Sequence, residues 1–290
     1  MKRITVLTPT YNRAYILDNL YNSLISQTVK DFIWLVIDDG STDGTKDKIE
    51  SYKQENKIEI NYIFQNNCGK YVAHNTGVTM SETELIVCVD SDDALYPNAI
   101  EKTLRFWKEH KNDDIAGIVS PKDMGGTSYF NNPPAKSTLL NLYNKQQLIG
   151  ETMLVFRTDV LKKYLFPEIK GEKFMSESVI YNQIDQEYSL VVQNEYLYKA
   201  EYQKDGLTVN ITKVHWKNPK TTLIMYKAIA AFQSNFFTAA KAYGSYLAWK
   251  EIRKLDECSL FTVKINVKII GGLLLSHYRH LFERQKEELK

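Results

Sequence analysis

The stretch Leu85-Ile86-Val87-Cys88-Val89-Asp90-Ser91-Asp92-Asp93 decides the fold. Its first five residues are apolar, as in a buried strand, and three carboxylates follow within four residues. Carboxylates this close repel one another, and a divalent cation is the partner that hard oxygen ligands favour. The sequence therefore predicts a strand whose carboxyl end holds a cation and, through the open positions of that cation, a diphosphate.

Strand-like and helix-like segments alternate on both sides of this stretch. Strands are predicted at residues 4–7, 32–37, 58–64, 85–89 and 115–119. Helices are predicted at residues 14–26, 42–56, 69–80 and 96–110. This alternation predicts a parallel sheet with helices on both faces, and ligands of such sheets bind beyond the carboxyl ends of the strands.

A polar loop follows each of the first four predicted strands, at residues 8–13, 38–41, 66–70 and 90–93. We expect these loops to converge on one edge of the sheet and to form the binding site. Two common phosphate-binding patterns, G-x-x-x-x-G-K-[ST] and G-x-G-x-x-G, do not occur in the sequence. Phosphate is therefore expected to be bound through a metal ion.

The second half of the chain is less regular. Residues 122–136 contain two glycines and two prolines and are expected to form a flexible loop or lid. Beyond them the pattern predicts a strand at 152–156, helices at 159–165 and 176–184, and a strand-like run at 188–200. After Pro219 the pattern becomes helical and rich in aromatic residues.

Charge is distributed unevenly. The net charge is +2, yet residues 206–290 carry 14 Lys/Arg against 6 Asp/Glu. This bias suggests a contact with an anionic partner such as a membrane surface. Residues 206–250 alternate Lys with apolar residues, as an interfacial helix would. An amphipathic set of helices packed on the acidic part of the chain explains the same pattern equally well.

Composition sets further bounds. Of the 290 residues, 43% are hydrophobic and 25% are charged, as in a soluble globular protein. The three cysteines are far apart and are expected to be reduced, which favours a cytoplasmic location. The N-terminal residues lack the apolar run of a signal peptide, and the longest apolar run, 269–275, is too short to span a membrane. No nucleic-acid-binding module is recognised.

Three motifs in order carry a family resemblance. Residues 6–13 (VLTPTYNR), 36–43 (VIDDGSTD) and the D-x-D motif within 90–93 resemble the family 2 glycosyltransferases of the GT-A fold. The resemblance implies an α/β fold with a Rossmann-like mixed sheet flanked by helices, and a helical C-terminal extension. It also implies a nucleotide-sugar-binding half at 1–120, an acceptor-binding half with the catalytic base at 121–215, and a basic helical extension at 216–290.

The resemblance further implies site residues. The positions expected to contact the nucleoside, ribose and phosphates are Pro9, Thr10, Tyr11, Arg13, Lys70, Asp90 and Ser91. Asp39 is expected to accept a hydrogen bond from the base, most often uracil, and Asp92 to bind Mn²⁺ or Mg²⁺.

Simpler interpretations stay open for several of these positions. Pro9 can merely end a strand, and Tyr11 can belong to the core. Asp38 can serve only to hold its turn. Asp93 can cap the following helix or support the site from behind.

Sugar transfer needs the leaving diphosphate neutralised and the acceptor hydroxyl deprotonated. A single displacement then inverts the anomeric centre without a covalent intermediate. The resemblance places the general base at Glu177, although Ser178 stands where the second acid of the usual pair is found. A helix-starting box of Ser176 and Glu177 is the structural alternative. Glu151 and Glu172 are the other candidates for the base.

Two later features have weaker interpretations. Residues 205–208 resemble a loop that closes over the phosphates. His215 can bind a metal, but a lone histidine beside a tryptophan is more often structural.

The expected function is that of a metal-dependent inverting glycosyltransferase. A UDP-sugar would donate a hexosyl or N-acetylhexosaminyl group to a hydroxyl of a glycan or lipid-linked saccharide, as in bacterial-type surface polysaccharide synthesis. The alternatives are a nucleotidyltransferase and a non-catalytic protein that binds nucleotide-sugars or glycans. The expected location is cytoplasmic, with peripheral contact to the inner face of the membrane through the basic C-terminal region as the alternative to packing.

Overall fold

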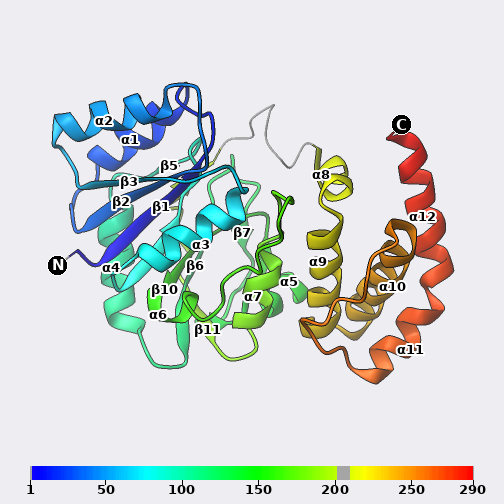
Figure 1. The fold of residues 1–290 in the computed structure, drawn as a ribbon. Coiled ribbons are helices and arrows are strands. Elements are labelled where there is room, and N and C mark those ends of the chain that lie inside the picture. Colours follow the sequence, from blue (N-terminus) through cyan, green and yellow to red (C-terminus); the bar gives the residue numbers. More distant parts are fainter. Residues whose placement is uncertain (1, 201–209, 290) are drawn as a thin grey trace. The chain divides into compact units, whose positions relative to one another are not determined.

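The computed structural model of the protein describes residues 2–200 and 210–289 (Figure 1). The chain forms two compact units, one from Met1–Leu165 with Glu187–Lys204 and the other from Phe166–Gln186 with Asp205–Lys290. The predicted boundaries at residues 120 and 215 separate a donor-binding part, an acceptor-binding part and a helical extension. They are defined by the ligands that these parts would bind, so they stay a prediction. The loop expected at 205–208 lies outside the described residues.

The first unit is built around an eight-stranded sheet with the strand order β3-β2-β1-β4-β10-β6-β11-β8. Its strands are β1 (Ile4–Thr10), β2 (Phe32–Asp38), β3 (Ile60–Phe64), β4 (Leu85–Cys88), β6 (Ile115–Pro121), β8 (Lys136–Ser137), β10 (Thr152–Arg157) and β11 (Ser189–Val192). The four neighbours β3, β2, β1 and β4 are parallel. They correspond to the first four predicted strands, with ends within three residues of those predicted.

The sheet is mixed, so the parallel sheet expected from the alternating pattern alone is wrong beyond β4. The strand β10 inserts between β4 and β6 and runs antiparallel to both. Periodicity shows which residues form a strand but not which strand lies beside it, because pairing is made by residues far apart in sequence. The mixed sheet implied by the family resemblance is the arrangement found.

Helices cover both faces of this sheet (Figure 1). On one face, α1 (Leu17–Ile25), α2 (Thr45–Glu55) and α4 (Ala99–His110) share a hydrophobic core with alternate residues of β1 and β2. On the other face, α3 (Lys70–Met80) packs against β1, where Gly77 allows close approach because a Cβ there would lie 2.1 Å from a Leu7 methyl group. The core thus fixes the sheet whose carboxyl edge carries the polar loops.

Shorter elements surround the sheet. They are β5 (Ala94–Leu95), β7 (Tyr129–Phe130), α5 (Leu139–Asn144), β9 (Leu148–Ile149), α6 (Thr158–Leu161) and β12 (Tyr198–Lys199). The run predicted as one strand at 188–200 divides into β11 and β12, and β12 pairs with β5. The segment 122–136, expected to be a loop or lid, contains β7, which pairs with β9.

The second unit is helical. Its elements are α7 (Ser178–Ile184), α8 (Ile211–Lys217), α9 (Pro219–Phe232), α10 (Phe236–Arg253), α11 (Ile265–Leu273) and α12 (Leu275–Glu288). Leu223 of α9, Tyr246 and Trp249 of α10, and Phe282 of α12 form one of its buried clusters. The apolar side chains of α9 and α10 are therefore largely buried within this unit.

No helix in the described part of the chain is both long enough and apolar enough to cross a membrane.

Candidate active site

The register of the parallel strands brings the four polar loops to one edge of the sheet. Thr10 at the end of β1 pairs with Asp38 at the end of β2, and Asp38 pairs with Phe64 at the end of β3. Leu7 of β1 pairs with Cys88, the last residue of β4. The loops that begin after these strands therefore start side by side, as the rule for parallel sheets predicts.

The loops after β1 and β2 are joined by hydrogen bonds. The Asn12 N–H donates to the Ser41 hydroxyl at 2.8 Å, and the Thr42 N–H donates to the Asn12 side-chain oxygen at 2.8 Å. Asn12 adopts a left-handed backbone conformation with φ of 52°, which asparagine tolerates better than most residues. This link fixes the backbone on either side of Asn12, at Tyr11 and Arg13.

Asp39 is buried and organises the third loop. Its carboxylate accepts hydrogen bonds from the Gln65 side-chain amide at 2.8 Å and from the backbone N–H groups of Cys68 and Gly69 at 2.9 and 2.7 Å. These bonds hold the residues that lead into α3, whose first residue is Lys70. Asp39 therefore has a structural role in holding the third loop. Its predicted contact with the nucleotide base stays a prediction.

The neighbouring Asp38 holds its turn, as the simpler interpretation proposed. Its carboxylate accepts from the Ser41 N–H at 2.8 Å and from the Tyr62 hydroxyl at 2.7 Å. Gly40 completes the turn with φ of 87°, and a Cβ at this position would lie 2.9 Å from the Asn67 nitrogen. Only glycine meets both conditions without strain.

The fourth loop carries the aspartates. The Lys70 ammonium lies 2.7 Å from a carboxylate oxygen of Asp90, which joins the third loop to the fourth. Although burial acts in the opposite direction, Lys70, Lys122 and Arg13 hold the pKa of Asp90 below its ordinary value. Burial and the nearby Asp90 charge raise the pKa of Asp92. Two neighbouring carboxylates thus have different environments, because nearby positive charges outweigh burial at Asp90 but not at Asp92.

Asp93 is buried behind the other two carboxylates. The Tyr198 hydroxyl donates to its carboxylate at 2.6 Å and accepts from the Asp90 backbone N–H at 3.0 Å. Burial raises the pKa of Asp93 to about 6, although Lys122 and the Tyr198 hydrogen bond act to lower it. The proposed helix-capping role is wrong, because Asn98 occupies the N-cap of α4. Asp93 supports the loop from within.

Lys122 completes this cluster. Its ammonium lies 3.6 Å from Asp93, 3.7 Å from Glu151 and 4.3 Å from the centre of the Tyr198 ring. Although burial acts against its charge, the carboxylates of Asp90, Asp93 and Glu151 raise the pKa of Lys122. A buried cation close to the aspartates is therefore retained in its charged form.

Sequence reasoning missed both Lys122 and Tyr198. Lys122 directly follows β6, so the rule about carboxyl ends of strands would have identified it. No local pattern indicates Tyr198, because only the pairing of β12 with β5 brings it beside Asp93.

The other predicted nucleotide-binding residues lie at the same edge. Pro9 and Thr10 end β1, and Tyr11, in the next position, has 48% of its surface exposed and so is not a core residue. The Thr10 hydroxyl is buried with no hydrogen-bond partner among the described residues. Ser91 is buried within the aspartate loop.

The candidate bases divide between the two units. Glu177 is exposed and occupies the N-cap of α7, so it does not stand at the third helical position that a capping box requires. Glu172 is buried, and its two oxygens accept from the Lys220 and Thr221 N–H groups at 2.8 Å each, at the start of α9. Glu151 belongs to the first unit and pairs with Lys122.

His215 has a structural environment in the second unit. Its Nδ1 lies 3.1 Å from the Thr222 hydroxyl, and its ring packs edge-on against Phe174. Burial lowers its pKa. The structural interpretation of this histidine therefore accounts for its contacts.

The donor set of the aspartate loop fits a cation that also binds a nucleotide. Across residues 2–200 and 210–289, no group of three or more His, Cys, Asp or Glu side chains is arranged to hold a metal by itself. Magnesium-type sites often use only one or two carboxylates and take their remaining ligands from phosphate and water. Burial and the charge of Asp90 raise the pKa of Asp92, as expected for two carboxylates that share a site.

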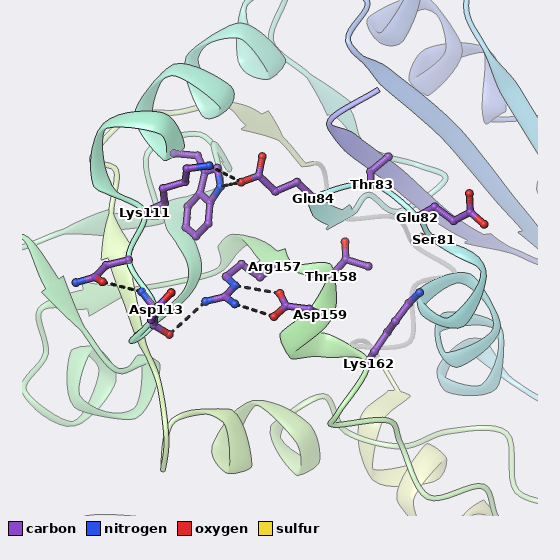
Figure 2. Close-up of a pocket in the computed structure, with 12 residues that line it drawn as sticks. Ser81, Glu82, Thr83, Glu84, Lys111, Asp113, Arg157, Thr158, Asp159 and Lys162 are labelled. Carbon is purple, nitrogen blue, oxygen red and sulfur yellow. Dashed lines mark hydrogen bonds and ion pairs between the residues drawn. The ribbon is translucent and has the colours of Figure 1, made fainter. Parts of the chain in front are cut away.

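A separate pocket of about 680 Å³ lies at the amino end of β4 (Figure 2). Two ion pairs lie in its walls: Lys111 lies 2.9 Å from Glu84, and Arg157 lies 2.7 Å from Asp159 (Figure 2). Because this pocket is at the edge opposite the four loops, it is not the predicted site.

Comparisons with known proteins agree with this arrangement. The model of the family described as Glycosyl transferase family 2 matches residues 5–165, which is more than half of the chain. The poly(ribitol-phosphate) beta-N-acetylglucosaminyltransferase TarP of Staphylococcus aureus is 34% identical over 129 residues, which are 43% of this chain and 39% of TarP. The minor teichoic acid biosynthesis protein GgaA of Bacillus subtilis is 28% identical over 218 residues, which are 70% of this chain and 48% of GgaA. The chain thus spans less than half the length of these two relatives.

Solved structures share the fold. S. aureus TarS 1-349 in complex with UDP-GlcNAc superimposes with a TM-score of 0.61 at 19% identity, covering 99% of this chain and 92% of that one. The mannosyltransferase PcManGT from Pyrobaculum calidifontis, in complex with GDP-Man and Mn²⁺, gives a TM-score of 0.58 at 15% identity, covering 98% and 84%. The expected GT-A fold is confirmed. Together with the family match, these findings show that the chain belongs to glycosyl transferase family 2.

Proposed function

We propose that the protein transfers a sugar from a UDP-sugar to a hydroxyl group of a glycan or lipid-linked saccharide, in the synthesis of a surface polysaccharide. The observation that carries this proposal is the convergence of Lys70, Asp90 and Asp92 at the carboxyl edge of β1 to β4. The relatives support the substrate class, since TarP and TarS are named for a poly(ribitol-phosphate) acceptor and TarS has been solved with UDP-GlcNAc. A nucleotide-sugar donor and reduced cysteines favour a cytoplasmic location.

We expect the donor nucleotide to lie across the first three loops. A carboxylate has about four lone-pair positions, so Asp39 retains capacity for a base N–H beyond its three present hydrogen bonds. The buried Thr10 hydroxyl offers a polar contact that the protein itself leaves unused in the described residues. Arg13 supplies positive charge for the phosphates, and Tyr11 an exposed ring for stacking.

A divalent cation would be held by Asp92, with the diphosphate providing further ligands. When bound, it neutralises charge on the leaving nucleoside diphosphate. Lys70 and Asp90 form the adjacent pair, and Lys70 is placed to exchange part of its contact with Asp90 for a phosphate oxygen.

For the general base we favour Glu177. It is exposed at the start of α7, whereas both oxygens of Glu172 are occupied by the first turn of α9. Glu151 is the remaining carboxylate, but the Lys122 ammonium lies 3.7 Å from it. With the acceptor hydroxyl deprotonated by this base, its oxygen would displace the nucleoside diphosphate in one step and invert the anomeric centre.

The proposal is tested by incubating the protein with a panel of UDP-sugars and Mn²⁺, and by measuring thermal stabilisation and UDP release. A bound donor raises the melting temperature because it binds only the native state. Asp92→Asn is expected to abolish the metal-dependent part of both signals, whereas Asp47→Asn, on the exposed surface of α2, serves as the matched control. The proposal fails if no nucleotide-sugar is bound or turned over, or if the two variants behave alike.

A further inference from the structure

Helix α11 has two apolar faces. Val267 and Gly271 are buried and face α10, where a Cβ on Gly271 would lie 2.7 Å from the Ala240 carbonyl oxygen. Ile265, Ile269 and Leu273 are 77%, 62% and 75% exposed. These three residues recur every fourth position and therefore share one face of the helix, two positions away from the buried pair. The packing of the second unit accounts for one face and leaves the other in water.

The exposed face is large for a single short helix. Large aliphatic side chains that are exposed one at a time are common, but a contiguous apolar stripe marks an interaction surface. Ile270 and Leu260 are also exposed, at 37% and 50%. We call Ile265, Ile269 and Leu273 the α11 stripe.

The charge around the α11 stripe is positive. Lys264 and Lys268 are exposed on and immediately before the helix. No acidic residue occurs in the sequence between Glu257 and Glu283, whereas this interval also contains Arg279. An apolar stripe bordered by lysines without neighbouring acids is complementary to a surface that is both apolar and anionic.

We propose that the α11 stripe inserts into the interface of an anionic lipid bilayer and holds the protein at the membrane surface. A helix of nine residues is about 14 Å long, less than half the thickness of a bilayer core, so α11 would lie in the interface rather than cross it. The aliphatic side chains would enter the acyl boundary, and Lys264 and Lys268 would remain at the headgroups. The surface is distinct from α9 and α10, whose apolar residues are largely buried.

Vesicle co-sedimentation of the full chain tests this proposal. We expect binding to vesicles of phosphatidylcholine with phosphatidylglycerol, weaker binding at high salt, and little binding to phosphatidylcholine alone. Replacing all three stripe residues by serine is expected to weaken binding by more than about tenfold. Lys264→Gln with Lys268→Gln is expected to weaken it roughly 30-fold, from about 1 kcal/mol for each lysine.

The controls separate membrane binding from other effects. Met80 is 57% exposed in the first unit, and Met80→Ser is expected to leave vesicle binding unchanged. Because the stripe residues are exposed, the serine variant should unfold at the same temperature as the parent protein. Vesicle binding needs no turnover, so its absence would leave the proposed function standing.

Three outcomes would overturn the proposal. The first is that the parent protein fails to bind anionic vesicles. The second is that the serine variant binds them as well as the parent does. The third outcome is seen by sedimentation velocity without lipid: a dimeric parent and a monomeric serine variant would show that a second copy of the chain covers the stripe.

Discussion

One tyrosine hydroxyl connects Asp90 and Asp93, the outer residues of the loop at 90–93. Tyr198 accepts from the Asp90 backbone N–H and donates to the Asp93 carboxylate, and Lys122 lies over its ring. These contacts hold the backbone of the loop that carries Asp92, while no atom of Tyr198 is required to touch a substrate. Its expected role is to position the loop.

Replacing Tyr198 by Phe should therefore affect both stability and donor binding. The change removes one partner from a buried carboxylate, which costs about 1–3 kcal/mol of unfolding free energy. It also frees the Asp90 N–H, so we expect weaker binding of the UDP-sugar by calorimetry. Tyr196→Phe is the matched control, since its hydroxyl donates to the Ser128 carbonyl oxygen rather than to the loop at 90–93. Equal donor affinity in the two variants would contradict a positioning role.

The assignment of the base makes a separate prediction. Glu177→Gln keeps the shape of the side chain but cannot accept the proton, so kcat should fall by about 10²–10⁴ while donor affinity is retained. Glu151→Gln is the comparison, because this residue is the remaining candidate in the first unit. If Glu151→Gln, rather than Glu177→Gln, shows the large fall in kcat, the assignment is wrong.

At the scale of elements, the position of β10 depends on one glycine. Gly117 of β6 pairs with Phe156 of β10, and a Cβ at this glycine would lie 1.9 Å from the Val155 carbonyl oxygen. Any side chain at this position would push the two central strands apart. Gly117 is therefore a condition for the insertion of β10 between β4 and β6.

We accordingly expect Gly117→Ala to lower the free energy of unfolding by roughly 1–3 kcal/mol or more, as overpacking does in other cores. Urea titration followed by circular dichroism measures this change. Gly272→Ala in α11 is the control, because a Cβ there meets open space and alanine is favoured in helices. A Gly117→Ala variant as stable as the control would show that the sheet adjusts without cost.

At the scale of the whole molecule, buried histidine links stability to pH. His74 of α3 is 7% exposed, and burial, assisted by the Lys70 charge, lowers its pKa to about 4. In the unfolded chain its pKa is near 6.5, so the unfolded state binds the additional proton between these two values. The stability associated with neutral His74 is therefore complete above pH 6.5 and is lost as the pH falls toward 4.

The expected loss from this group is about 3 kcal/mol between pH 6.5 and 4. Carboxylates also titrate in this range, so the difference between the parent and His74→Gln isolates the histidine. Urea unfolding at several pH values should show a shallower decline for the variant. Parallel curves for the two proteins would contradict the prediction.

Many strands and loops of the first unit can be predicted from the sequence, because each is indicated by residues that are neighbours in the chain. The apolar run 85–89 followed by aspartates, and the loops after β1, β2 and β3, indicate a parallel sheet with a site at its carboxyl edge. The role of Asp38 in its turn also agrees with that reading, whereas metal binding by Asp92 stays a prediction. A role for Glu177 as the general base is predicted only through the family resemblance.

The sequence by itself determined the alternation of strands and helices in the first half, the family, and the edge of the sheet that carries the polar loops. The tertiary structure alone decided the antiparallel insertion of β10 and the pairing of β12 with β5 that brings Tyr198 to Asp93. It also decided which face of α11 is left exposed. The physical reason is that periodicity records which side of an element is apolar, whereas the identity of its neighbour depends on contacts between residues far apart in the chain.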